Sequence, residues 1–141
     1  MNLPFSEKAG VILQLAEKNA NKRKNPSIIP GGSAANTAVG FSSCGGKSLF
    51  VGNVGEDKFG KSFERSILNE GVFFNPKLKN ISSEPTSKSI ILVTEDAERT
   101  MCTYLGASTR LYFSEIDKSL FNFARIIYFE GCGEHLEEGQ R

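Results

Sequence analysis

Two glycine-rich segments contain the residues best suited to bind a ligand. The first, residues 30–38, reads PGGSAANTA. Its paired glycines, Gly31 and Gly32, allow a sharp turn and let a ligand approach the main chain. A helix that begins near Ser33 would point backbone N–H groups at this turn, and Asn36 would add its amide one turn later. These groups suit a ligand rich in hydroxyls, although a glycine turn before a tightly packed helix would use the same small residues.

The second segment, residues 55–62, reads GEDKFGKS and matches the phosphate-loop pattern G-x-x-x-x-G-K-S. Such a loop would use Lys61 and Ser62 to hold phosphates and Mg²⁺. However, Glu56 and Asp57 would bring two negative charges into the phosphate cradle. Asp57 is also a good N-cap, which would place the second glycine inside the first helical turn. We therefore favour a strand-to-helix turn here and keep nucleotide binding as the weaker alternative.

A single carboxylate stands out elsewhere in the chain. Residues 126–129, IIYF, read as a buried strand, and Glu130 follows directly. Ligands of open α/β sheets bind at the carboxyl ends of strands. Glu130 is therefore a candidate acceptor for ligand hydroxyls, with a surface position at the strand end as the alternative.

The remaining pattern predicts the elements that position these residues. Helices are expected over residues 6–19, 33–43, 57–69 and 114–123, and strands over residues 27–29, 49–54, 72–74 and 125–129. Residues 87–94 and 99–104 predict a β hairpin, linked by residues 95–98. Strands that alternate with helices predict a mostly parallel α/β sheet, and we expect the hairpin to stand off it as a flap.

Composition excludes several classes of function. The 141 residues suit one domain, and 17 basic against 16 acidic residues argue against nucleic-acid or anionic-membrane partners. No apolar run exceeds four residues, whereas a membrane-spanning helix needs about 20. The start of the chain lacks the pattern of a signal peptide. One histidine, His135, and three widely spaced cysteines predict a cytoplasmic protein with reduced thiols and no structural metal site.

Taken in order, several segments resemble the ribokinase (PfkB) family of carbohydrate and nucleoside kinases. Residues 30–38, then Gly45-Gly46 and VGNVGEDKFG at residues 51–60, are similar to its first signature. Residues 98–108 look like its lid strand and the segment that follows, and residues 126–131 look like its next core strand. The residues in these segments are most similar to those of the adenosine kinase-like sugar kinase branch. The resemblance implies a ribokinase-like three-layer α/β fold with a small β lid hairpin, truncated at both ends.

The resemblance also implies a substrate-binding set, which consists of Gly31, Gly32, Ser33, Asn36, Arg99 and Glu130. The glycines and the asparagine would hold sugar hydroxyls, with the serine lining the same turn. The lid arginine would reach the substrate or face solvent. Closure of the lid would exclude water from the phosphoryl acceptor.

The implied reaction is ATP-dependent transfer of a phosphoryl group to a hydroxyl of a sugar or nucleoside, with ATP and Mg²⁺ in the intact enzyme. The family's second signature, D-T-x-G-A-G-D with the catalytic aspartate, is absent, and residues 132–141 depart from the family. We therefore expect residues 1–141 to be a partial kinase domain, inactive alone, that carries the substrate platform and lid. The alternative is a non-catalytic sugar-binding or assembly module, as a homo-oligomer or paired with a complementing C-terminal chain.

Overall fold

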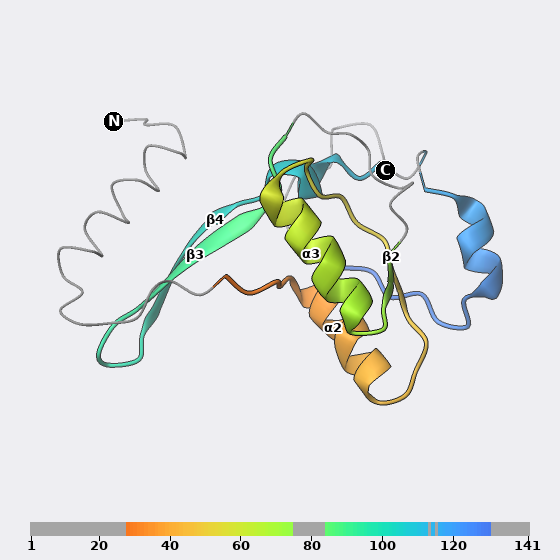
Figure 1. The fold of residues 1–141 in the computed structure, drawn as a ribbon, viewed down its shortest axis with the longest axis horizontal. Coiled ribbons are helices and arrows are strands. Elements are labelled where there is room, and N and C mark those ends of the chain that lie inside the picture. The colour runs from red at the N-terminus through yellow and green to blue at the C-terminus, as the bar shows by residue number, and fades with distance from the viewer. Residues whose placement is uncertain (1–27, 75–83, 113, 115, 131–141) are drawn as a thin grey trace.

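The computed structural model in Figure 1 describes residues 28–74, 84–112, 114 and 116–130. The described elements are α2 (Ser33–Ser43), β1 (Leu49–Phe50), α3 (Lys58–Asn69), β2 (Phe73–Phe74), β3 (Lys88–Val93), β4 (Arg99–Tyr104) and the 3-10 helices η2 (Gly106–Arg110) and η4 (Lys118–Phe123). Within these ranges, no helix has the length and apolar character needed to cross a membrane. The predicted helix over residues 6–19 lies outside the described residues, as does most of the loop before the hairpin.

The helices α2 and α3 confirm two predictions made from local sequence. α2 occupies the predicted range, and α3 begins one residue later than predicted because Asp57 serves as its N-cap. The Asp57 side chain accepts a hydrogen bond from the Gly60 N–H at 2.8 Å, which satisfies one of the open donors of the first turn. After α3, Gly71 adopts a φ of 76°, a left-handed conformation that is open to glycine at little cost and ends the helix.

The two short strands β1 and β2 pair in parallel, with Leu49 opposite Phe73 and Phe50 opposite Phe74. Because α3 connects them, the three elements form a β-α-β unit, as the alternating pattern predicts. Beside this unit lies a small core formed by Ala35, Val54, Ile67, Val72 and Phe74. The parallel α/β architecture predicted from the sequence is therefore present.

Aromatic packing joins α3 to the strand pair. The ring centroids of Phe50, Phe63 and Phe74 lie 5.7 to 5.9 Å from one another in tilted or edge-on arrangements. Contacts of this kind add to the free energy gained from burying the rings. The orientation of α3 on the strands is set in part by this trio.

The predicted hairpin is confirmed. β3 and β4 pair antiparallel from Lys88 opposite Tyr104 to Val93 opposite Arg99, and the pair extends away from the helices (Figure 1). The connecting turn contains Ala97, which adopts a φ of 66°. At the other end of the hairpin, Lys88 Nζ lies 5.1 Å from the centre of the Phe59 ring. The hairpin thus stands off the fold as expected, with its foot beside the start of α3.

Two predicted strands are wrong within the described residues. Ile28 and Ile29 lie in irregular, exposed backbone, and residues 125–129 are also irregular. Residues 126–129 expose between 47% and 83% of their surface, although the sequence predicts a buried strand. A strand requires a neighbour to complete its hydrogen bonds, and neither segment pairs with one in the described part of the chain.

Two further elements are shorter than predicted. β1 ends at Phe50, four residues early, although Asn53 and Val54 beyond it remain buried. The helix expected over residues 114–123 is only the 3-10 helix η4. Asp117 caps η4 by accepting a hydrogen bond from the Ser119 N–H at 2.9 Å. η4 therefore begins at Lys118, four residues later than the predicted start at residue 114.

Adjacent residues of β2 provide a matched test of this core. Phe74 is 4% exposed and Phe73 is 64% exposed. We expect Phe74→Ala to lower the free energy of unfolding by about 3 kcal/mol, because it leaves a cavity beside Phe50 and Phe63. The control Phe73→Ala should change it by less than about 1 kcal/mol. Urea denaturation followed by circular dichroism measures both, and equal losses would contradict this account of the core.

Candidate functional site

The predicted glycine turn is open at the start of α2. Gly32 is the N-cap residue and adopts a φ of 109°, and no side chain caps the helix. The first helical hydrogen bond runs from the Asn36 N–H to the Gly32 carbonyl at 2.8 Å, so the N–H groups of Ser33 and the next two residues have no partner within the helix. The turn therefore presents backbone donors to a ligand.

The space above the two glycines of this turn is open. A Cβ atom added at Gly31 or Gly32 would meet nothing within 4 Å. Close packing therefore does not account for these two glycines, whereas Ala35 lies in the core and Ala38 packs against it, as the alternative of a tightly packed helix expects. Gly32 is required by its left-handed φ, and the space above the pair is available to a ligand.

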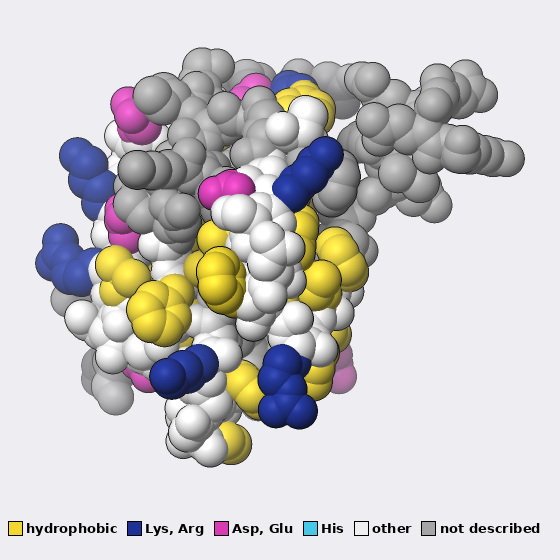
Figure 2. Space-filling view, turned by 90° about the vertical axis from the view of Figure 1, so that its right-hand side faces the viewer, with side chains coloured by type: hydrophobic (Ala, Val, Ile, Leu, Met, Phe, Trp, Pro, Cys, Tyr) yellow, Lys and Arg dark blue, Asp and Glu magenta, His cyan; other side chains and the backbone are white. Residues whose placement is uncertain are grey.

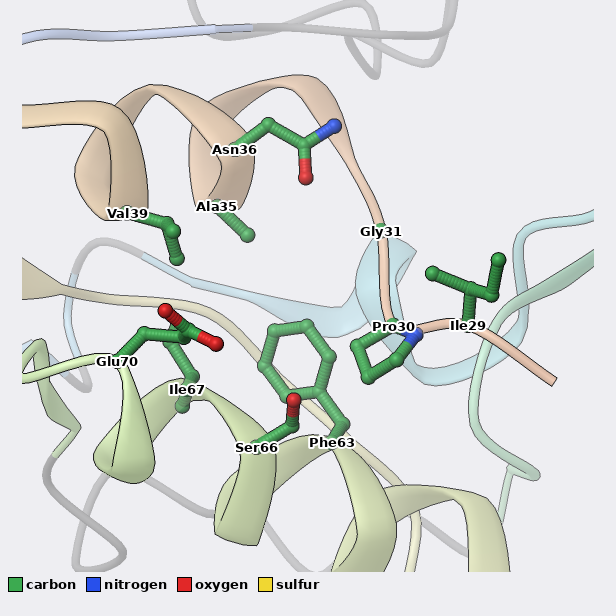
Figure 3. Close-up of a pocket in the computed structure, with 10 residues that line it drawn as sticks. All are labelled: Ile29, Pro30, Gly31, Ala35, Asn36, Val39, Phe63, Ser66, Ile67 and Glu70. Carbon is green, nitrogen blue, oxygen red and sulfur yellow. The ribbon is translucent and has the colours of Figure 1, made fainter. Parts of the chain in front are cut away.

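A pocket of about 180 Å³ lies between α2 and α3 (Figure 3). Among the described residues, its polar side chains are those of Asn36, Ser66 and Glu70, and the rest of its lining is Gly31, Ile29, Pro30, Ala35, Val39, Phe63 and Ile67. Apolar walls with a few polar groups are typical of small-molecule sites. Ser66 and Glu70 are functional candidates that were not predicted from the sequence. Their spacing of four residues places them on one face of α3, but sequence alone does not show that this face meets α2.

The structure brings only part of the predicted substrate-binding set together. Gly31 and Asn36 line the pocket, and Gly32 and Ser33 lie between them in the chain. Arg99 lies at the start of β4, beside the hairpin turn, and does not line the pocket. Glu130 is exposed and accepts a hydrogen bond from the Tyr128 hydroxyl at 3.2 Å. The roles of Arg99 and Glu130 remain predictions.

Close packing accounts for the glycines of the phosphate-loop pattern. A Cβ atom at Gly55 would lie 2.6 Å from the Glu84 carbonyl oxygen, and one at Gly60 would lie 2.1 Å from the Gly55 carbonyl oxygen. Lys61 is exposed, and its N–H donates to the Asp57 carbonyl within the first helical turn. This segment is a strand-to-helix turn packed against residues 84–86, and it leaves no cradle for phosphates.

Asp57 also joins the start of α3 to the foot of the hairpin. Its Oδ1 accepts a hydrogen bond from the Thr86 hydroxyl at 2.7 Å, and its Oδ2 accepts one from the Thr86 N–H at 3.0 Å. Thr86 is 5% exposed, and its Oγ1 also accepts a hydrogen bond from the Gly55 N–H at 3.0 Å. We call this arrangement of Gly55, Asp57, Gly60 and Thr86 the Asp57–Thr86 junction.

Hydrogen bonds within the junction favour the ionised form of Asp57. Burial by itself would raise the pKa of this carboxyl. The Thr86 hydroxyl and the backbone N–H groups of Gly60 and Thr86 lower the pKa by more in total, so it lies below its ordinary value of 3.8. The carboxylate therefore holds structure together rather than acting as a base at neutral pH.

The fold and the open turn together define a class of protein. A glycine turn that opens a helix, a β-α-β unit and a hairpin standing off beside it are features of a ribokinase-like α/β fold. The family model described as pfkB family carbohydrate kinase matches residues 5–139. The chain belongs to the pfkB family of carbohydrate kinases.

Individual relatives support the same assignment. The chain is 32% identical over 124 residues to probable fructokinase-6, chloroplastic, of Arabidopsis thaliana, across 83% of this chain and 29% of that protein. It resembles the solved adenosine kinase from Sinorhizobium meliloti with a TM-score of 0.63 and 34% identity, across 85% of this chain and 34% of that one. A probable sugar kinase from Rhizobium etli gives a TM-score of 0.62 and 39% identity, across 83% and 33%. The chain thus spans about a third of the length of these relatives.

The Asp57–Thr86 junction predicts a specific dependence of stability on pH. Because the pKa of Asp57 is lowered in the folded state, its contribution is complete above 3.8 and is lost as the pH falls through the lowered value. We expect Asp57→Asn to lower the free energy of unfolding by about 1 to 2 kcal/mol at pH 7, since the new amide would face the Thr86 N–H. The difference from the unsubstituted chain should shrink at acid pH.

The control for this prediction is Glu56→Gln, which removes an exposed neighbouring carboxylate and should leave stability nearly unchanged. Urea titrations at pH 7 and at several values below 4 measure the effect. A difference between Asp57→Asn and the unsubstituted chain that stays constant down to the lowest pH would contradict the assignment.

Proposed function

We propose that this chain supplies the sugar- or nucleoside-binding platform and the lid of a kinase that transfers a phosphoryl group from ATP to a substrate hydroxyl. The observation that carries this proposal is the open glycine turn at the start of α2. Free space lies above Gly31 and Gly32, the first helical N–H groups are uncapped, and Asn36 lines the adjoining pocket. Family membership supplies the reaction class.

Each polar group at this turn has a chemical role toward a polyol. The uncapped N–H groups donate to substrate oxygens, and the Asn36 amide both donates and accepts. Apolar side chains such as Val39 and Phe63 can cover the C–H face of a sugar ring. Contacts that fix the ring also fix the direction of its reactive hydroxyl, which is how positioning lowers the barrier to phosphoryl transfer.

Other components of the reaction are inferred from the family. ATP with Mg²⁺ would supply the phosphoryl group, but the described residues do not form a site for either, since Lys61 and Ser62 lie exposed on α3. Arg99 would reach the substrate when the hairpin closes, and Glu130 would approach from the segment that follows η4. Cys44 and Cys102 are free thiols, which fits the reducing cytoplasm that we infer for this chain.

An assembly role is the second candidate, and a separate observation favours it. Residues 126–129 and Phe73 are exposed and apolar. Figure 2 shows hydrophobic side chains gathered among Lys and Arg on the face that lies to the right in Figure 1, where η4 is drawn. Exposed apolar clusters favour association, here with a second copy or with a chain that carries later parts of the family fold.

Substitution of Asn36 tests the proposed site. We expect Asn36→Ala to weaken the binding of fructose or adenosine about tenfold, because two hydrogen bonds to substrate hydroxyls are lost. Lys61→Ala, on the exposed side of α3, is the control and should bind as the unsubstituted chain does. Isothermal titration calorimetry measures both. Full affinity in Asn36→Ala together with loss in Lys61→Ala would overturn the site.

Catalysis provides a second test. We expect the purified chain to release no ADP from ATP in the presence of ribose, fructose or adenosine, because its sequence contains no D-T-x-G-A-G-D segment. A coupled assay of ADP release makes the measurement. Sugar-dependent turnover that persists through purification and disappears in Asn36→Ala would show that the chain contains a complete catalytic site.

A further inference from the structure

The wall of the pocket opposite Asn36 is formed by α3. Ser66 lies on this helix and Glu70, four residues later, is its C-cap residue. Figure 3 shows the hydroxyl and the carboxylate on the side that faces α2. Neither residue belongs to the glycine turn or to the phosphate-loop pattern. The pocket therefore has a second set of polar groups, on a different element from the first.

The described lining of this pocket carries negative charge and no positive charge. Among the described residues that line the pocket, Glu70 is the only charged one, and none is a lysine or an arginine. A hydroxyl group in the pocket can donate a hydrogen bond to the carboxylate. A phosphate group in the same position would meet a negative charge, with no cation among the described lining residues to pair with.

The apolar residues that line the pocket limit further which kinds of ligand would fit it. Phe63, Ile67 and Val39 face the same space as the three polar side chains (Figure 3). A sugar ring matches this mixture, because its faces carry C–H groups and its rim carries hydroxyls. A ligand with charge or polarity on every side would leave its groups against apolar walls without hydrogen-bond partners.

We propose that Ser66 and Glu70 select the unphosphorylated form of the ligand. Glu70 accepts a hydrogen bond from a ring hydroxyl, Ser66 donates to or accepts from its neighbour, and the Glu70 carboxylate disfavours the same ligand once it carries a phosphate. This inference rests on the proposed function, because it specifies which form of a sugar or nucleoside the same pocket admits. A kinase with such a wall would bind its substrate in preference to its product.

The test compares matched ligands, fructose with fructose 6-phosphate and adenosine with AMP. We expect the unsubstituted chain to bind the neutral member of a pair more tightly. Glu70→Gln should reduce that preference about three- to tenfold, and the reduction should be smaller at 1 M salt, where charge interactions are screened. Ser66→Ala should weaken binding of the neutral ligand about two- to tenfold, through loss of one hydrogen bond. Glu95→Gln, exposed in the hairpin turn, is the matched control.

Calorimetry gives the affinities, and NMR spectra of the ¹⁵N-labelled chain show where the ligand binds. Chemical-shift changes at residues 66–70 as well as 31–36 are expected with the neutral ligand. An unchanged preference in Glu70→Gln, or shifts confined to residues 31–36, would overturn this inference and leave the proposed site intact if Asn36→Ala still weakens binding. If the unsubstituted chain binds neither neutral ligand, the proposed site and this inference both fail.

Discussion

The hydrogen bonds to the Asp57 carboxylate are the constraint on which the described structure depends. One side chain caps α3 and holds both the N–H and the hydroxyl of Thr86. The backbone around these contacts is packed so closely that a Cβ atom at Gly55 would meet the Glu84 carbonyl oxygen and one at Gly60 would meet the Gly55 carbonyl oxygen. A second contact, a hydrogen bond from the Ala107 N–H to the Pro85 carbonyl at 2.9 Å, joins the segment that precedes β3 to the segment that follows β4. The direction of α3 and the foot of the hairpin are therefore fixed together.

From this fixed start, α3 passes the strand pair and then the pocket. Its Phe63 packs on Phe50 and Phe74, while Phe63 also lines the pocket beside the glycine turn. One aromatic ring thus belongs to both the core and the candidate site. Any change that shifts α3 on the strands would also move Ser66 and Glu70 relative to Asn36, so the stability of this small core and the shape of the pocket are coupled.

Elements determined by neighbouring residues could be predicted from the sequence. α2, α3 and the hairpin each carry their own start and stop signals, such as Asp57 as N-cap and Gly71 after the last turn. Residues 126–129 could not be placed in this way, because an apolar run becomes a strand only when another segment supplies its hydrogen bonds. Ser66 and Glu70 were missed for a related reason, since their place in the pocket depends on which helix lies opposite.

The hairpin has a mechanical property that follows from its attachment at one end. Each strand has six residues, which at about 3.4 Å per residue makes an arm of roughly 20 Å between the Asp57–Thr86 junction and the turn beside Arg99. A rotation of about 10° at the junction would carry the far end through roughly 3.5 Å, which is more than the length of a hydrogen bond. The hairpin therefore amplifies small adjustments at its foot, and the reach of Arg99 is determined by residues at the opposite end of the arm.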